Sequence, residues 1–253
     1  PVADALQKAL DACLERSKSR RIRKDTQFFE LACAAIRRPA ISILAVEDYG
    51  TTGLVGPSIP GKPFHALVKG SGVSQKSSAD AGGSFGIGKN AAFAVSQFRT
   101  VFYSTLYSDG PSQQFLAQGK AILVSHTDSA GAEKRGIGYC GQPDFHPVSD
   151  AAELPDWLHR TQTGTTVASL GFLNEDGWEW QMTESLVRNF FAAILEGAVS
   201  FSVVPEDGDP IKIDPSTLGA LFKHDRVLKA AEDTGSSADL AFAAALYQAL
   251  VSP

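Results

Sequence analysis

The sequence is poor in cysteine and has no long apolar run, and each shortage excludes a class of protein. Its three cysteines, Cys13, Cys33 and Cys140, are odd in number and form no C-x-x-C pair, which argues against a disulfide framework and against a zinc site. The five histidines are scattered without ligand spacing, so no metal site is predicted. Since neither a transmembrane-length segment nor a signal peptide is present, we expect a cytoplasmic protein that makes no membrane contact.

The chain also lacks an excess of positive charge. Its net charge of −5 at pH 7 argues against a protein that coats nucleic acid along its whole length, but it permits a local basic patch. The densest basic run is Arg-Ser-Lys-Ser-Arg-Arg-Ile-Arg-Lys, from Arg16 to Lys24. Such runs are most often solvated loops, and contact with nucleic acid or an acidic partner is the alternative.

What the chain does have is a glycine-rich stretch from Gly82 to Thr105, which predicts a turn, a short helix and a strand in that order. Gly83, Gly86 and Gly88 permit positive φ angles and a close approach of the backbone to a ligand. The N–H groups that open the helix at Lys89 would point at an anion, so a phosphate is the expected ligand.

Spacing alone leaves several families open. Gly83 to Lys89 fits the P-loop pattern G-x-x-x-x-G-K, but Asn90 stands where that loop needs a hydroxyl for magnesium. Gly86 to Ala91 fits the dinucleotide pattern G-x-G-x-x-A. Both patterns need a buried apolar strand directly before the glycines, and residues 70–81 form a polar, loop-like segment instead. A P-loop NTPase and a dinucleotide-binding enzyme therefore stay as alternatives, as does a glycine turn without a ligand.

Gly-Ser-Phe-Gly-Ile-Gly, followed by a small-residue helix and a Val-Phe-Tyr-Ser strand, resembles the GHKL or Bergerat ATPase superfamily, nearest its heat-shock-chaperone and MORC-like branch. In that superfamily the glycine motif closes a lid over the triphosphate of ATP. The resemblance implies that the loop and the motif contact the nucleotide through Ser74, Lys76, Gly83, Ser84, Phe85, Gly86, Ile87, Gly88 and Lys89.

The first superfamily motif, E-x-x-x-N-x-x-D-A on a helix, is matched in register by the segment from Asp4 to Ala12. The resemblance implies that Asp4 is the catalytic residue that activates the attacking water, and that Lys8 takes the place of the asparagine that holds Mg²⁺. Because an ammonium cannot coordinate a cation, Lys8 contacts phosphate directly, points elsewhere, or marks a domain that hydrolyses ATP poorly. Whether Mg²⁺ accompanies the ATP is left open.

Two further matches follow. An apolar segment from Ile41 to Val46 predicts a buried strand, and the residues after it resemble the motif D-x-G-x-G with one extra threonine. The resemblance implies that Asp48 accepts a hydrogen bond from the adenine amino group, while Gly50 and Gly53 let the backbone pass the base. Gly-Thr at 164–165 resembles the last motif, which implies that the Thr165 hydroxyl lies near the base.

The resemblance implies an α+β fold, the Bergerat two-layer α/β sandwich, with a mixed and mostly antiparallel sheet covered on one face by helices. We expect an ATP-binding domain over residues 1–200, with a family-specific insertion around 126–160. Residues 201–253 would form a hairpin and a helical extension that leads to a module absent from this sequence. In the 178–196 helix we expect Asp176 as the cap, and Leu186, Phe190, Ile194 and Leu195 as the buried face.

The function that the resemblance implies is an ATP-binding and ATP-hydrolysing head of a larger protein. ATP would close the lid and pair two heads as a homodimer, switching an effector in a chaperone-like, MORC-like or anti-phage defence role. Nucleic acid or a partner protein would be contacted through the downstream module. The alternatives are a nucleotide sensor that does not hydrolyse ATP, suggested by Lys8, and the P-loop NTPase.

Overall fold

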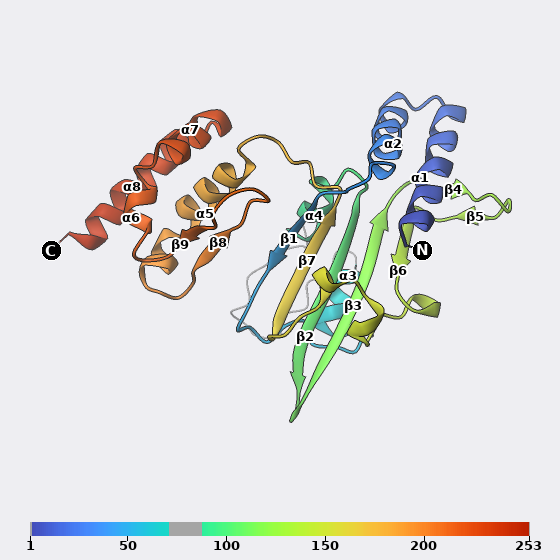
Figure 1. Ribbon diagram of the computed structural model, residues 1–253, viewed down its shortest axis with the longest axis horizontal. Helices are drawn as coiled ribbons and strands as arrows, with labels where there is room; N and C mark the ends of the chain where they lie inside the picture. The colour runs from blue at the N-terminus through green and yellow to red at the C-terminus, as the bar shows by residue number, and fades with distance from the viewer. Residues whose placement is uncertain (1, 71–87, 253) are drawn as a thin grey trace. The chain divides into compact units, whose positions relative to one another are not determined.

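The structure is a computed structural model that describes residues 2–70 and 88–252, with the side chains of Val2 and Lys89 left out (Figure 1). The chain divides into two compact units, residues 1–173 and 174–253. The division predicted from the sequence lies at residue 200. The boundary lies earlier because the long helix α5 (Trp178–Leu195) packs against the helices that follow it.

Unit 1 is an α+β domain. In chain order its elements are α1 (Val2–Ser19), α2 (Arg23–Ile36), β1 (Ile43–Glu47), α3 (Pro63–Val68), η1 (Gly88–Asn90), α4 (Ala91–Ala94), β2 (Thr100–Asp109), β3 (Ser112–Ile122), β4 (His126–Thr127), β5 (Glu133–Lys134), β6 (Ile137–Cys140), η2 (Pro143–Phe145), η3 (Ala151–Glu153), η4 (Asp156–Leu158) and β7 (Gly164–Leu170). The predicted short helix and strand agree with α4 and β2, whereas most of the predicted glycine-rich turn lies outside the described residues.

Five strands form one sheet in the order β1-β7-β2-β3-β6 (Figure 1). Every pairing in it is antiparallel, so the parallel pair that a mixed sheet requires is not found among the described strands. The segment predicted to be an insertion supplies β6, which lies at one edge beside β3. Strand β7 enters between β1 and β2, although β1 precedes it by more than a hundred residues.

Strand β1 corrects one prediction. Its apolar sequence predicts a buried strand, but β1 is the edge of the sheet and four of its five residues are exposed. The side chains of Ile43 and Val46 are 37% and 57% exposed. A strand that is apolar on both faces is typical of a sheet interior, and only the pairing with neighbours decides whether it lies there.

The central strand β2 is buried on both faces, so the sheet is covered on two sides rather than one. On one face Val101, Tyr103 and Tyr107 pack with Phe64 of α3 and Phe93 of α4. On the other face Phe102 packs with Ala168 and with Leu158 of η4. The second face is thus covered by the short turns of residues 151–158 and not by a long helix.

Helices α1 and α2 pair with each other at one end of the sheet (Figure 1). The buried residues of α1 recur at helical spacing, as the sequence predicts. They pack with buried residues of α2, with Phe98 before β2 and with Leu170 at the end of β7. The cluster consists of Leu6, Leu10, Cys13, Phe29, Ala32, Cys33, Ala35, Ile36 and Phe98.

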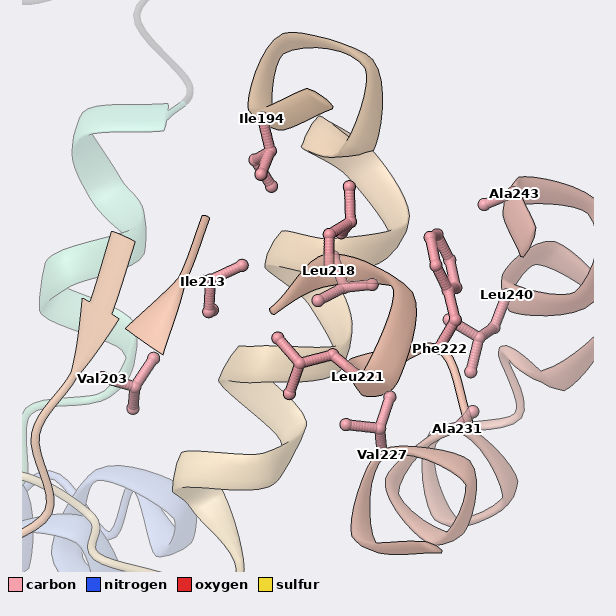
Figure 2. Packing of buried hydrophobic residues seen from close by; sticks show 11 residues of the cluster. Ile194, Val203, Ile213, Leu218, Leu221, Phe222, Val227, Ala231, Leu240 and Ala243 are labelled. Atoms are coloured by element: carbon pink, nitrogen blue, oxygen red, sulfur yellow. The ribbon is translucent and has the colours of Figure 1, made fainter. Parts of the chain in front are cut away.

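Unit 2 has its own core. It contains α5, β8 (Phe201–Val203), β9 (Ile211–Ile213), α6 (Leu218–Leu221), α7 (Asp225–Thr234) and α8 (Ser237–Val251). The core side chains from all six elements point toward one another; ten of them are labelled in Figure 2. Two predictions fail here: Gly177, not Asp176, occupies the N-cap position of α5, and Phe190 is 47% exposed. The buried face of α5 instead includes Thr183, Glu184, Val187 and Ile194.

Glu184 is the notable polar member of this face, because it is only 1% exposed. Its Oε1 accepts hydrogen bonds from Arg188 Nε at 2.6 Å and from Ser236 Oγ at 2.9 Å. A buried carboxylate needs such partners, since desolvation of its charge is otherwise uncompensated. Among residues 2–70 and 88–252, none of the helices combines the length and apolar character that crossing a membrane requires.

Replacing Arg188 with alanine should destabilise unit 2 by ~3 kcal/mol, because it leaves the Glu184 charge buried without its cation. The control is Arg226→Ala, which removes an exposed arginine from α7 and should change stability by less than about 0.5 kcal/mol. Urea unfolding followed by tryptophan fluorescence measures both. Equal stabilities of the two variants would show that the ion pair with Arg188 does not compensate the buried carboxylate.

Candidate functional site

Asp48 and Thr165, which the sequence analysis assigns to one site, are joined in the structure. Asp48 is the first residue after β1, and Thr165 is the second residue of β7. The Asp48 N–H donates to the Thr165 carbonyl at 3.0 Å, and the Thr165 N–H donates to Asp48 Oδ1 at 3.0 Å. The Asp48 side chain thereby accepts from a β7 N–H directly beyond the last residue pair of the β1–β7 ladder.

The Asp48 carboxylate is held through one of its two oxygens. The Thr51 hydroxyl also donates to Asp48 Oδ1, at 2.5 Å. Within the described part of the chain, Oδ2 accepts no hydrogen bond, and the residue is exposed. The carboxylate is therefore oriented by the protein while its second oxygen remains available as an acceptor.

Three glycines shape the backbone around Asp48. Gly50 and Gly53 have φ angles of 70° and 68°, which glycine adopts readily. A Cβ on Gly53 would lie 2.6 Å from the Leu106 carbonyl oxygen, so this glycine lets the chain pass closely over β2. A Cβ on Gly164 would lie 2.6 Å from Asp48 Oδ1, so the Asp48 carboxylate can bond to β7 only because residue 164 has no side chain.

A second polar network surrounds Glu47, which the sequence analysis did not assign to the site. Glu47 Oε1 accepts from the Thr166 hydroxyl at 2.9 Å, and Oε2 accepts from the Tyr49 hydroxyl at 2.6 Å. Arg160 Nη1 donates to the Thr166 hydroxyl at 2.6 Å, and its guanidinium lies 5.1 Å from the centre of the Tyr49 ring. These four side chains form a closed ring of contacts.

Arg160 connects the two networks, because its Nη2 also donates to the Asp48 carbonyl. Its Nε is buried and finds no partner in the described residues. The hydrogen bond to Glu47 raises the pKa of Tyr49, so at neutral pH the phenol stays protonated and continues to donate. Because Glu47 adjoins Asp48 in the sequence, its position gives a weak indication that it belongs to the site. Nothing in the sequence around Arg160 indicates its partners.

Alternation along β7 directs the side chains of Thr165 and Thr166 to opposite faces of the sheet, whereas Asp48 bonds to the main chain of Thr165. The side chains of Thr165, Val167 and Ser169 share one face, and Val167 packs there with the α3–α4 cluster. The Ser169 hydroxyl donates to the Ala92 carbonyl of α4 at 2.8 Å. Thr165 and the segment that follows the glycine motif thus lie on the same face, about 14 Å apart at 3.4 Å per residue along β7.

The described end of the glycine motif consists of Gly88, Lys89 and Asn90, which form η1 and lead into α4. Gly88 is exposed, and a Cβ on it would meet nothing within 4 Å. The other residues assigned to the phosphate loop lie outside the described residues: Ser74, Lys76, Gly83, Ser84, Phe85, Gly86 and Ile87.

The structure does not bring the predicted catalytic helix to Asp48. Asp4 and Lys8 are exposed on α1, whose buried face packs at the Leu170 end of β7. Asp48 bonds at the Thr165 end of that strand, about 17 Å away at 3.4 Å per residue. The roles of Asp4 and Lys8 stay predictions.

No built metal site is found in the described residues. They contain no group of three or more His, Cys, Asp or Glu side chains placed to hold an ion. Lys8, at the position where the superfamily motif has a metal ligand, is a cation. The described residues therefore do not offer a donor set that fits Mg²⁺.

Comparison of the chain with protein-family models, with curated proteins and with solved structures finds no match in any of the three.

Gly164→Ala should displace Asp48 and destabilise unit 1 by about 2–3 kcal/mol, because the new Cβ collides with the carbonyl oxygen and the carboxylate of Asp48 at a φ of 141°. Gly110→Ala is the control, since Gly110 also has a positive φ, of 60°, but a Cβ there meets nothing within 4 Å. It should cost only the backbone strain, about 1 kcal/mol. Urea unfolding of both variants provides the measurement, and equal losses would mean that the contact between Gly164 and Asp48 is not tight.

Proposed function

We propose that unit 1 binds ATP, with its adenine amino group at Asp48. The observation that carries the proposal is that the Asp48 carboxylate accepts hydrogen bonds through only one of its oxygens. Thr165 and Thr51 donate to Oδ1, and Oδ2 remains available as an acceptor. An exocyclic amino group is the donor that such an acceptor recognises on adenine. A carboxylate already fixed by a strand N–H loses little conformational freedom when the ligand binds, which favours selective recognition.

The distance along β7 supports an elongated ligand. Thr165 lies at one end of a sheet face and Ala92 of α4 lies near the other, beside Ser169. Because the α3–α4 cluster fills this face, a nucleoside triphosphate would lie outside that packing, with its base at Asp48 and its phosphates toward η1. The N–H groups after the glycine motif would then stabilise the phosphate charge.

The proposal includes hydrolysis of ATP, in which Asp4 would act as the general base toward the attacking water. Lys8 would contact the triphosphate in place of a metal ligand. By the same resemblance, two ATP-bound heads would pair and switch an effector of chaperone-like, MORC-like or defence type. The second candidate is a nucleotide sensor without turnover, favoured by the ammonium of Lys8 at a metal-ligand position.

Asp48→Asn is a clean test, because the asparagine Oδ1 can still accept from the Thr165 N–H while Nδ2 replaces the free acceptor with a donor. The variant should bind ATP at least about tenfold more weakly, since a mispaired contact costs on the order of 1–3 kcal/mol. Inosine triphosphate, which has a carbonyl oxygen in place of the amino group, should bind the variant at least as tightly as the wild type, because the asparagine Nδ2 can donate to that oxygen. The wild type should therefore prefer ATP to inosine triphosphate, and the variant should lose this preference.

Calorimetric titration with the two nucleotides measures this preference. Asp109→Asn, which changes an exposed aspartate at the end of β2, is the matched control and should keep the preference for ATP. A wild type that binds both nucleotides equally would refute the adenine role of Asp48. Absence of binding to either nucleotide would refute the proposal as a whole.

Variants of Lys8 and Asp4 distinguish an ATP-hydrolysing domain from a nucleotide sensor without turnover. If Lys8 contacts phosphate, Lys8→Ala should weaken the binding of ATP about tenfold. The binding of adenosine should hardly change, because only ATP carries the charge that the ammonium pairs with. Lys223→Ala, an exposed lysine of unit 2, serves as the control. Asp4→Ala should abolish turnover and spare binding, as measured by phosphate release. Turnover that survives Asp4→Ala would exclude Asp4 as the base.

A further inference from the structure

The basic run from Arg16 to Lys24 covers the end of α1, the connecting residues 20–22 and the start of α2, and we call these residues the basic turn. Arg16 pairs with Glu133 at 3.5 Å, and Lys18 pairs with Glu15 at 3.8 Å. The remaining cations are all exposed and have no ion pair within the described part of the chain. They are Arg20, Arg21, Arg23 and Lys24.

The basic turn is a local reversal of the protein's charge. Residues 15–30 contain six Lys or Arg and three Asp or Glu, which gives them a net charge of +3. Because the whole chain carries −5, the other residues together carry −8. A compact positive surface on an acidic protein attracts a polyanion locally, while the remainder limits general adsorption.

Two hollows flank the basic turn. The larger, of about 480 Å³, is lined by Lys18, Arg21, Arg23, Thr26, Gln27 and Glu30. The smaller, of about 260 Å³, is lined by Arg16, Ser17, Arg20, Ile22, Asp25, Val124 and Ser125. Each combines two arginines with hydroxyl or amide groups and with one carboxylate. Arg16 Nε, in the wall of the smaller hollow, is buried and finds no acceptor in the described residues.

We propose that the basic turn binds the phosphate backbone of a nucleic acid, with successive phosphates received by the two hollows. Four of its six cations are arginines, whose planar guanidinium matches phosphate oxygens in a bidentate geometry. Neutral donors beside the arginines suit a phosphate, which accepts several hydrogen bonds at once. Recognition through the backbone alone gives binding without a sequence preference.

A membrane surface fits the turn less well than a nucleic acid. Helices and turns that bind lipid carry several apolar side chains beside their cations. The basic turn exposes one large apolar side chain, Ile22, which is 42% exposed. The next along the chain is Leu31, eight residues after Arg23 on α2. An acidic peptide shares the charge but lacks the tetrahedral phosphates that two separate hollows would receive.

The test compares two triple variants with equal charge change. Arg20→Gln/Arg23→Gln/Lys24→Gln neutralises the basic turn, and Lys212→Gln/Lys223→Gln/Arg226→Gln neutralises three exposed cations of unit 2. Fluorescence anisotropy measures binding of a labelled mixed-sequence DNA duplex, and of an RNA of the same length, between 50 and 200 mM salt. Polyglutamate and phosphatidylserine vesicles are the comparison ligands.

The basic-turn variant should lose at least about tenfold in affinity for duplex DNA at low salt. The slope of log K against log salt should become shallower by about 2.7, since each phosphate contact contributes about 0.9. The control variant should keep both values of the wild type. Circular dichroism should show equal folding of the two variants, because all six residues are exposed.

Three results would overturn the proposal. The first is an affinity of the wild type for nucleic acid that does not change with salt. This measurement uses no variant, so it does not depend on whether a variant folds. The second is an equal loss in both variants, which would indicate net charge rather than the basic turn. The third is binding of polyglutamate or vesicles as tightly as nucleic acid with the same dependence on the turn, which would identify an acidic peptide or a lipid surface as the partner.

Discussion

The reciprocal pair between Asp48 and Thr165 is the contact on which the candidate site depends. It follows directly on the β1–β7 ladder, with the Asp48 side chain as one of its acceptors. Because β1 lies at the edge of the sheet and is largely exposed, packing contributes little to fixing its end. The hydrogen bonds to Thr165 and the close approach at Gly164 therefore determine where the carboxylate lies.

The polar residues around this pair occur where local packing would accept apolar ones. Thr166 is fully buried and lies opposite Ser104 in the central part of the sheet. Its hydroxyl has a donor in Arg160 and an acceptor in Glu47, so burial of the group is compensated. Such a network rigidifies the end of β1 from the face opposite Thr165. Sites that depart from apolar packing in this way are where function is expected.

The two units divide the physical tasks. Unit 1 contains the sheet, the Asp48 carboxylate with its available Oδ2, and the basic turn. The core of unit 2 is built from α5 to α8 and a short hairpin. Each core is made of residues from its own unit, so a cavity or an unpaired charge in one is expected to affect that unit first. The early division after Leu173 follows from α5, whose buried residues pack within unit 2.

The sequence by itself indicated the α+β class through the resemblance, and it indicated most of the elements because the helical spacing of a segment such as α1 is a local property. It also associated Asp48 with Thr165 through the resemblance of two short motifs. Only the tertiary structure decided that β1 is an exposed edge, that α5 belongs to the second core, and that Arg160 joins Asp48 to Glu47. Burial and hydrogen-bond partners depend on which segments become neighbours, and neither apolar pattern nor residue type encodes that over the 112 residues that separate Arg160 from Asp48.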